Sequence, residues 1–308
     1  MDYSMTRLPL SDETRLPRGS IVALITPFAK DGGLDRTALR KLIDFHVTSG
    51  TAAIAVVGTT GESSTLSHVE HREVIAAAVE YAEGRIHIMA GVGANSTSEA
   101  VELARFASDH GASSLLSVVP YYVKPTQQGL FDHFTAQADV VRIPLVLYNV
   151  PGRTVTDMTA STVARLAHHP NIRGLKDATG DMARAVEILR ALPSGFALYS
   201  GDDFTSLPYL ALGGWGVISV LANVVPAKVV EMCSLMEQGK IARARRLFVQ
   251  LQPLTRALFA ETSPGPVKYA ASLLGQCEAT LRLPLVIPGE PTRRLIEQCV
   301  KGELEHAA

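Results

Sequence analysis

Lys176 and Tyr148 are the residues whose types and spacing predict covalent chemistry in this chain. Lys176 follows Ile172 and Leu175 in NIRGLKDATGD, where a strand would end, and Tyr148 closes the apolar run PLVLYNV about one β-α unit earlier. An ammonium among apolar side chains loses solvation, which favours the free amine that attacks a ketone and forms a Schiff base. A phenol beside the imine can exchange protons with it. A lysine whose charged head reaches solvent from a strand end is the alternative that the local sequence leaves open.

Further polar side chains follow neighbouring apolar runs. The segment PYYVKPTQQG supplies Tyr121 and Tyr122, and Arg153 comes shortly after Tyr148. A guanidinium can bind a substrate carboxylate through two parallel hydrogen bonds. Tyrosines also close the ends of barrels as amphipathic plugs, and for any one tyrosine that interpretation is favoured. Three tyrosines at two successive strand ends shift the balance toward a reactive site.

The segment GTTGES, residues 58–63, ends another apolar run. Its small residues allow close backbone approach, and Thr59 and Thr60 offer hydroxyl and backbone N–H groups to a carboxylate. A plain Ser/Thr turn is the alternative. The segment lacks the GK[ST] of a phosphate-binding P-loop and the spacing of a dinucleotide fingerprint, which argues against nucleotide binding.

The elements that position these residues follow from eight short apolar runs that alternate with amphipathic stretches of helical length, a pattern that predicts parallel β-α units. The runs are SIVALITPF, AAIAVVG, IHIMAGVG, SLLSVVP, PLVLYNV, IRGLKDA, FALYSGDD and GVISVL. Eight such units predict an α/β protein, a (β/α)8 TIM barrel whose site lies at the carboxyl ends of the strands. We expect a flexible N-terminal arm over residues 1–18, the catalytic barrel over 19–237, and a C-terminal helical extension over 238–308 packed on the barrel.

Composition limits the function classes. The chain has 308 residues, 47% of them hydrophobic and 19% charged, with a formal net charge of -1. This balance predicts neither nucleic-acid nor membrane binding, and the polar N-terminus has no apolar signal core, so we expect a cytoplasmic protein. Cys233, Cys277 and Cys299 form no CxxC, so neither a disulfide framework nor a zinc site is indicated.

Six motifs resemble one known family. GTTGES, PYYVKPTQQG, YNVPGRT, GLKDATG, SGDD and GVISV occur in the order and spacing of the dihydrodipicolinate synthase family, over about residues 19–290. Members of this family are pyruvate-dependent class I aldolases on a (β/α)8 barrel. Joint occurrence of the six motifs is highly specific for it.

The resemblance implies a role for each matching position. Lys176 would form the Schiff base with pyruvate, and Thr60 would hold the pyruvate carboxylate. Thr59, Tyr148 and Tyr122 would form a proton relay, with Tyr122 reaching into the site of a neighbouring subunit. A homo-oligomer is therefore implied, and a dimer of dimers is expected. No metal or organic cofactor is expected, because the amine activates the ketone itself.

The second substrate implied by the resemblance is aspartate semialdehyde, whose carboxylate Arg153 would bind, while the backbones of Gly201 and Ile218 line the pocket. The product would be hydroxytetrahydrodipicolinate, on the route to lysine. Sister enzymes that act on sugar acids or other keto acids are the alternative. Arg153 and the paired threonines favour the synthase, because a polyol would call for more hydroxyl and carboxylate partners.

Three positions depart from the family pattern. Val123 stands where the family usually has Asn, Asp177 where it has Glu, and Gly265 where the usual motif has Ile. None removes a proposed catalytic group. A paralogue with altered substrate or reduced activity is the alternative that they leave open.

Six further positions match those that bind the feedback inhibitor lysine in lysine-sensitive members of the family, so we expect L-lysine to inhibit. They are Ser63, His68, His71, Asn95, Glu99 and Tyr121. A zinc pair at the two histidines is disfavoured, because a closed site needs further ligands and such pairs are common on solvated helix faces. A capping box between Ser96 and Glu99 is a local alternative for Glu99.

Two functions outside this enzyme remain open. A regulatory paralogue would bind a keto acid without turnover, but Lys176, Tyr148 and Tyr122 are all present. A phosphate-binding isomerase on the same barrel would want a Gly-rich phosphate loop after the seventh or eighth strand. SGDD at that place is acidic and would repel phosphate.

Overall fold

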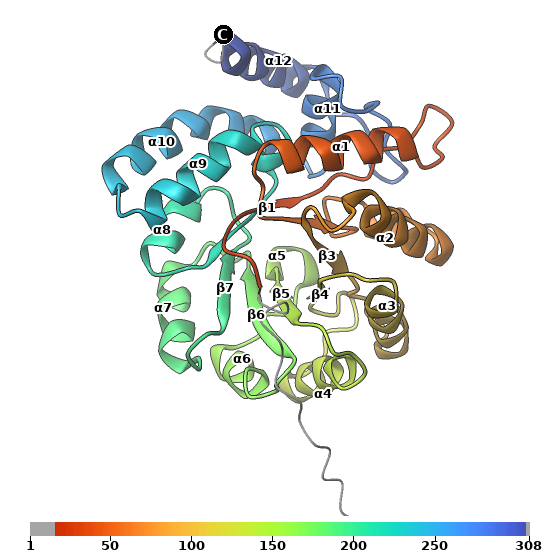
Figure 1. Cartoon of the computed structure of the whole chain (residues 1–308), viewed down its shortest axis with the longest axis vertical. Helices are drawn as coiled ribbons and strands as arrows, with labels where there is room; N and C mark the ends of the chain where they lie inside the picture. The colour runs from red at the N-terminus through yellow and green to blue at the C-terminus, as the bar shows by residue number, and fades with distance from the viewer. Residues whose placement is uncertain (1–15, 306–308) are drawn as a thin grey trace, which may run out of the picture.

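Eight parallel strands close into a barrel in a computed structural model that describes residues 16–305 (Figure 1). Each strand pairs with the next along the chain, and β8 pairs with β1, so the sheet has no edge. The strands are β1 Gly19–Ala23, β2 Ala53–Val56, β3 His87–Gly91, β4 Ser114–Val118, β5 Leu145–Asn149, β6 Ile172–Asp177, β7 Ala197–Ser200 and β8 Gly216–Ser219. This confirms the α/β class and the (β/α)8 barrel that the eight apolar runs predict.

Side chains alternate along each strand, which divides the core into two layers. One cluster fills the barrel interior and includes Ile21, Met89, Val146 and Tyr199. The larger cluster lies between the strands and the surrounding helices. Because residues of both faces are buried, the strands read as continuous apolar runs rather than as alternating patterns.

Helices surround the barrel (Figure 1). They are α1 Arg36–Thr48, α2 His68–Ala82, α3 Thr97–Asp109, α4 Gln127–Ala138, α5 Pro151–Thr154, α6 Ala160–Leu166, α7 Met182–Ala191, α8 Ser206–Ala211 and α9 Pro226–Glu237, with short 3-10 turns η2 Ser63–Thr65 and η3 Leu221–Asn223. Local capping fixes several starts: Asp35 caps α1, and Ser67 with Glu70 forms a capping box at α2. These caps set where each helix leaves the strand end that precedes it.

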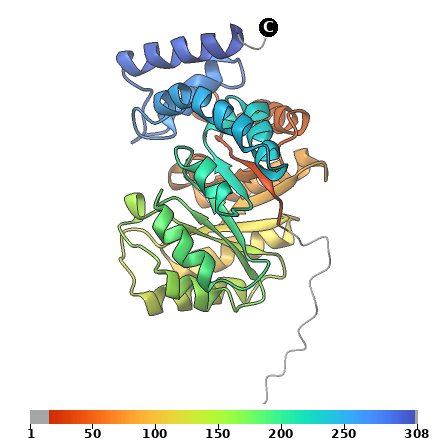
Figure 2. The same ribbon diagram turned by 90° about the vertical axis from the view of Figure 1, so that its left-hand side faces the viewer.

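Three further helices form a C-terminal layer on one side of the barrel (Figures 1 and 2). They are α10 Ile241–Leu258, α11 Gly265–Leu273 and α12 Glu290–Glu305. α10 packs on α9, and α12 packs on both α10 and α11. The predicted helical extension therefore exists as a packed layer, and its helices contact α8, α9 and η3 of the barrel.

The chain enters the barrel at its amino-terminal end. Residues 1–15 of the expected arm lie outside the described residues, but Leu16, Pro17 and Arg18 are fixed. Leu16 is buried with the barrel interior, the Tyr199 hydroxyl donates to the Pro17 carbonyl at 2.6 Å, and Arg18 lies over the Trp215 ring. The packed part of the chain thus begins before the boundary expected at residue 18.

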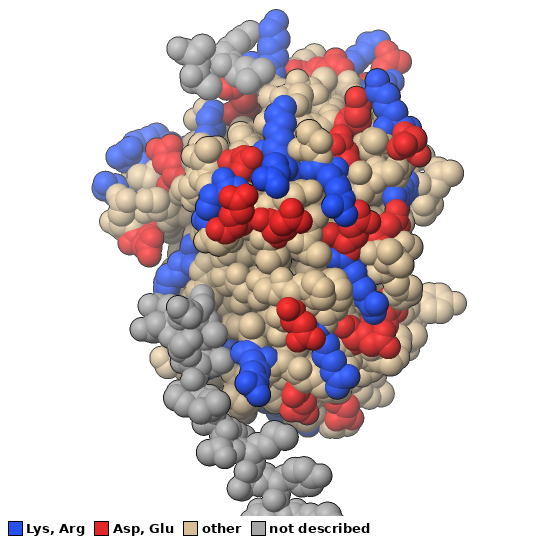
Figure 3. All heavy atoms as spheres, turned by 45° about the vertical axis from the view of Figure 1, so that its right-hand side comes forward, with Lys and Arg blue, Asp and Glu red and all other residues tan. Residues whose placement is uncertain are grey.

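Charges of both signs are interspersed on the face shown in Figure 3. Ion pairs between neighbouring helices include Arg36 with Glu73 and Arg72 with Glu102. Within residues 16–305, no helix combines the length and the apolar character that crossing a lipid bilayer requires.

Candidate active site at the carboxyl ends of the strands

Lys176 and Tyr148 lie side by side inside the barrel. They are register partners on β6 and β5, and the Lys176 Nζ is 4.2 Å from the centroid of the Tyr148 ring. Both side chains are buried, each with 6% exposure. Among residues 16–305, no carboxylate forms an ion pair with Lys176. The alternative of a lysine that reaches solvent is wrong, because the amine is enclosed beside a phenol and has no counter-ion there.

Gly201 leaves the space that the lysine side chain occupies. A Cβ atom at this position, just after β7, would lie 2.8 Å from Lys176 Cε and 2.9 Å from the Ala178 side chain. The Gly201 N–H donates to the Asp177 carbonyl at 2.7 Å, which holds the ends of β6 and β7 together. Ile218 on β8 is buried in the barrel interior. Gly201 thus lies against the Lys176 side chain, and Ile218 belongs to the cluster inside the barrel.

The GTTGES segment is a tight, pinned turn after β2. The Glu62 N–H donates to the Thr59 carbonyl at 3.1 Å, and the buried Thr26 hydroxyl donates to the Gly61 carbonyl at 2.7 Å. A Cβ at Gly61 would lie 3.0 Å from the backbone of Val57, so the turn needs a glycine there. Thr60 is buried with 5% exposure. The bond within the turn and the bond from Thr26 therefore hold the backbone of Thr59 and Thr60 at the carboxyl end of the barrel.

Two charged residues of the motifs, which the sequence interpretation left without a role, meet beneath this turn. Glu62 and Lys268 form an ion pair at 2.6 Å in which neither side chain is exposed. The second Glu62 oxygen accepts from the backbone N–H of Arg282 at 3.2 Å, and the Lys268 Nζ lies 4.0 Å from the centroid of the Phe28 ring. Burial lowers the pKa of the Lys268 amine, and Glu62 opposes that shift. The signal for this ion pair in the sequence was the presence of oppositely charged residues, Glu62 and Lys268, in two separate segments.

Arg153 lies on the short helix α5 after β5, exposed to solvent at the mouth of the barrel. Its Nη2 donates to the carbonyl of Ser263 at 3.1 Å. Pro151 begins the helix and Val155, with φ of 61°, ends it. The guanidinium is thus held near the segment that leads into α11 while keeping further donors for a ligand.

The PYYVKP segment projects outward. Tyr122 is 88% exposed and has a left-handed backbone with φ of 73°, and Val123 is 54% exposed. A non-glycine residue in this conformation is uncommon and marks a turn held by its surroundings or by function. The tyrosine plug is wrong for Tyr122, because its ring does not pack into the barrel. Within its own chain it is separated from the buried Lys176 and Tyr148.

Four of the six residues matched to lysine binding gather around Glu99. Its Oε1 is 3.5 Å from His68 Nδ1. Burial raises the pKa of Tyr121, and the Glu99 charge adds to that shift. Burial lowers the pKa of His71, whose Nε2 contacts the Gly91 carbonyl at 2.8 Å. His71 is therefore a buried residue, which corrects the expectation of a wholly solvated pair of histidines.

The remaining two of these six residues lie at element boundaries: Ser63 begins η2, and Asn95 precedes α3. The capping box between Ser96 and Glu99 is absent, because the Ser96 hydroxyl contacts that of Ser98 at 2.9 Å and makes no cap bond. Glu99 is thus turned toward His68. Among residues 16–305, no cluster of three or more His, Cys, Asp or Glu side chains has the arrangement of a metal site.

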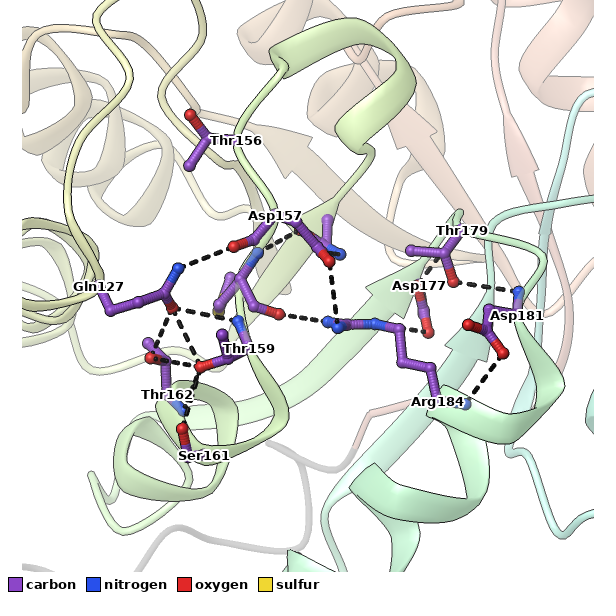
Figure 4. A network of polar contacts seen from close by, with 12 residues as sticks. Gln127, Thr156, Asp157, Thr159, Ser161, Thr162, Asp177, Thr179, Asp181 and Arg184 are labelled. Carbon is purple, nitrogen blue, oxygen red and sulfur yellow. Dashed lines mark hydrogen bonds and ion pairs between the residues drawn. The ribbon is translucent and has the colours of Figure 1, made fainter.

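A polar network outside the barrel wall links the strands that carry Tyr148 and Lys176 (Figure 4). Asp177 accepts from the Thr179 N–H at 3.1 Å, and its other oxygen is 3.7 Å from Arg184 Nε on α7. Arg184 also contacts Asp157 and the Met158 carbonyl, in the segment after β5. Burial raises the pKa of Asp177. Arg184 lies outside the six motifs, so the sequence did not predict this polar network.

Two of the departures from the family pattern have a structural context. A Cβ at Gly265 would lie 3.1 Å from the Val286 carbonyl, so glycine allows the segment before α12 to approach α11 closely. Asp177 Oδ2 and Arg184 Nε are buried and lack a hydrogen-bond partner. The aspartate at position 177 therefore leaves a gap between its carboxylate and Arg184, and the longer side chain of a glutamate would narrow that gap.

Comparison with known proteins agrees with this geometry. The model of the dihydrodipicolinate synthetase family matches residues 16–302. The chain is 52% identical over 295 residues to the 4-hydroxy-tetrahydrodipicolinate synthase of Thiobacillus denitrificans, covering 96% of this chain and 98% of that one. It is similar to the structure of the chloride-inhibited dihydrodipicolinate synthase from Acinetobacter baumannii complexed with pyruvate, with 46% identity, a TM-score of 0.90, and coverage of 92% and 98% of the two chains.

Two other similar structures bear on ligands and assembly. One is dihydrodipicolinate synthase from Cyanidioschyzon merolae with lysine bound, 38% identical with a TM-score of 0.89, covering 92% of this chain and 97% of that one. The other is described as a monomeric dihydrodipicolinate synthase variant, 38% identical with a TM-score of 0.90, covering 92% and 96%.

Proposed function

Because the chain belongs to the dihydrodipicolinate synthetase family, we propose that it condenses pyruvate with L-aspartate 4-semialdehyde to give 4-hydroxy-tetrahydrodipicolinate, in the route to diaminopimelate and lysine. It is a lyase-type enzyme that forms a Schiff base. The observation that carries the proposal is the buried Lys176 amine, which lies beside the Tyr148 ring and has no ion-pair partner among residues 16–305.

The reaction begins at Lys176. Its amine adds to the keto carbon of pyruvate, and loss of water gives the imine, with Tyr148 as the proton donor and acceptor. Thr60 holds the pyruvate carboxylate, and Thr59 connects Tyr148 to Tyr122 in a proton relay. Loss of a proton from the imine methyl group gives an enamine, whose carbon attacks the aldehyde carbon of the semialdehyde.

Arg153 supplies the charge for the second substrate. Its exposed guanidinium pairs with the carboxylate of the semialdehyde, while the Gly201 and Ile218 backbones line the pocket. After the new carbon–carbon bond forms, the amino group of the semialdehyde attacks the imine carbon. This attack closes the ring, and the bond to Lys176 then breaks, which releases the lysine as the free amine and leaves the former aldehyde oxygen as the 4-hydroxyl group of the product.

The proposed relay needs a second subunit. Tyr122 is 88% exposed on a left-handed turn, which supports its insertion into a partner's site. We therefore propose a homodimer as the active unit, and a dimer of dimers as the assembly. A monomeric relative exists, so light scattering on the purified protein is the direct test.

L-lysine is the proposed inhibitor. The six residues Ser63, His68, His71, Asn95, Glu99 and Tyr121 would bind it, with Glu99 attracting its amino groups. The lysine-bound relative supports this assignment. Tyr121 adjoins Tyr122, so a bound inhibitor could disturb the relay. Unchanged turnover in millimolar L-lysine would contradict it.

We also propose a cytoplasmic location and a division of the chain into two parts. The free thiols Cys233, Cys277 and Cys299 support a cytoplasmic enzyme, because oxidising compartments favour disulfides. We propose residues 19–237 as the catalytic barrel and 238–308 as the extension, because α9 ends at Glu237.

Borohydride reduction in the presence of pyruvate tests the function. Intact mass and peptide mapping should show one adduct, on Lys176, and semialdehyde added before reduction should relieve it as product forms. Trapping without a response to the semialdehyde would favour a related aldolase with another aldehyde. Absence of trapping on the folded wild-type protein would favour the inactive paralogue.

A further inference from the structure

Glu62 and Lys268 form the most enclosed ion pair described in this chain, with 0% side-chain exposure for both partners. Both Glu62 oxygens are satisfied, one by Lys268 Nζ at 2.6 Å and one by the Arg282 N–H at 3.2 Å. A buried pair whose carboxylate is fully hydrogen-bonded fixes geometry, whereas removal of one partner leaves an uncompensated charge. The pair joins residues 206 positions apart, so it ties two distant segments together.

One of these segments is the turn that carries the threonines. The Glu62 N–H closes the turn on the Thr59 carbonyl, and Glu62 has a left-handed backbone with φ of 56°. The Glu62 carbonyl also accepts from the Thr65 N–H at 2.9 Å, so the tertiary contacts of the Glu62 side chain act together with the backbone bonds of the turn to hold this conformation. The position of the Thr59 and Thr60 backbone is therefore coupled to the anchor of the Glu62 carboxylate.

The other segment leads from Ser263 to Lys268, at the start of α11. Its Ser263 carbonyl accepts from Arg153 at 3.1 Å, and its Lys268 binds Glu62. This single stretch of the C-terminal extension therefore contacts both the turn after β2 and the short helix after β5. Packing against α12 holds α11 in place from the outside.

We propose that Lys268 is a positioning residue for substrate binding, which sets the carboxylate-binding turn through Glu62 and makes the C-terminal extension part of the active-site architecture. The inference rests on the proposed function, in which Thr60 holds the pyruvate carboxylate. Lys268 touches no substrate. Its contribution is to keep the N–H and hydroxyl groups of the turn aimed at the carboxylate before pyruvate arrives.

The test is Lys268→Met in the full-length protein, with Lys228→Met as the matched control. Lys228 forms an ion pair with Glu303 on α12, which also joins the barrel helices to the extension but does not contact the turn. We expect Lys268→Met to raise the pyruvate concentration for half-maximal borohydride adduct about tenfold, while the adduct yield at saturation falls less than about threefold. Lys228→Met should leave both unchanged.

The double variant Glu62→Gln/Lys268→Met covers the case in which the single variant does not fold, because it leaves no charge unpaired. It still lacks the charged contact, so half-saturation should rise at least about threefold. A purely structural role would lower the amount of folded protein without moving half-saturation. Unchanged half-saturation in a folded Lys268→Met or double variant would overturn the proposal.

Hydrogen exchange separates failure of this inference from failure of the proposed function. The peptide that carries residues 58–63 should exchange about tenfold faster in whichever of the two variants folds than in the wild-type protein, with no substrate present. Unchanged exchange would overturn the positioning role even if pyruvate reacts normally. A wild-type protein that forms no adduct would instead refute the proposed function, and the exchange result would still decide whether Lys268 holds the turn.

Discussion

Lys176 and Lys268 are both buried, and both lie over an aromatic ring, but they differ in their partners. Lys176 Nζ is 4.2 Å from the centroid of the Tyr148 ring and has no ion-pair partner among residues 16–305. Lys268 Nζ is 4.0 Å from the centroid of the Phe28 ring and binds Glu62 at 2.6 Å. The Lys268 Nζ is occupied in a fixed contact with a carboxylate, whereas the Lys176 Nζ has no such contact and is available to attack a carbonyl carbon.

The difference shows that burial alone does not identify a nucleophile. Burial lowers the pKa of Lys268, yet its carboxylate partner makes it a structural cation. His46 extends the comparison, because it is buried and burial lowers its pKa to about 3. Among residues 16–305, the Thr51 hydroxyl is the one hydrogen-bond partner of its imidazole ring. A buried base with a counter-ion is held as a cation, and this histidine without one stays neutral.

Removal of the unpaired amine should have the largest effect. We expect Lys176→Met to abolish the borohydride adduct and to lower kcat by at least about 10³-fold, because no other group can form the imine. Steady-state kinetics and intact mass measure both. If Lys268 could substitute for Lys176, the peptide map of the variant would show an adduct at Lys268, and the comparison would fail.

Crowding of the amine should have the next largest effect. In Gly201→Ala the new methyl group would meet Lys176 Cε at 2.8 Å, so the lysine must shift. We expect kcat to fall roughly 10- to 100-fold with little loss of folded protein, because small misplacements of a reacting group are costly. Gly302→Ala, where nothing lies within 4 Å, is the control and should keep wild-type kcat.

The third buried base, His46, should change how the free energy of unfolding depends on pH. His46 has a folded-state pKa of about 3 against an ordinary value of 6.5, so the unfolded chain binds its proton first as pH falls. Its stabilising contribution is complete above pH 6.5 and is lost progressively as pH falls toward 3. Between pH 7 and pH 5, His46→Gln should lose about 2 kcal/mol less free energy of unfolding than the wild-type protein.

Urea denaturation at the two pH values measures this difference. The exposed His110 provides the matched variant, and His110→Gln should follow the wild-type pH dependence. Equal slopes for His46→Gln and the wild-type protein would show that His46 takes up its proton in the folded state over the same pH range as in the unfolded chain, against its assignment as a neutral buried base.

The smallest effect concerns the looser of the two buried ion pairs. Asp177 Oδ2 and Arg184 Nε are 3.7 Å apart and lack a hydrogen-bond partner, in contrast to the 2.6 Å contact of Glu62 and Lys268. Asp177→Glu extends the carboxylate toward Arg184, and we expect about 1 kcal/mol of added stability from the new hydrogen bond. Thermal unfolding measures it. A lower Tm, with Asp109→Glu unchanged, would mean that the site has no room for the added methylene.

The fold and the neighbouring positions of Lys176 and Tyr148 were predictable because their signals are local. Eight buried strands produce eight apolar runs, and Lys176 and Tyr148 stand at the ends of two of them. Local reasoning failed where partners are distant. The sequence interpretation assigned Glu99 in part to a capping box, but that box forms at Ser67 and Glu70 one helix earlier, while Glu99 faces His68.

The sequence alone determined the order of the β-α units and the residue types that stand at the strand ends, because both depend on short-range pattern and on the alternation of strand side chains. Only the tertiary structure decided which charges are paired. Glu62 and Lys268 are 206 positions apart, and their contact exists because closure of the barrel and packing of α11 bring both to one buried point. Only that pairing showed that, of the two buried lysines compared above, Lys268 has a carboxylate partner and Lys176 has none among residues 16–305.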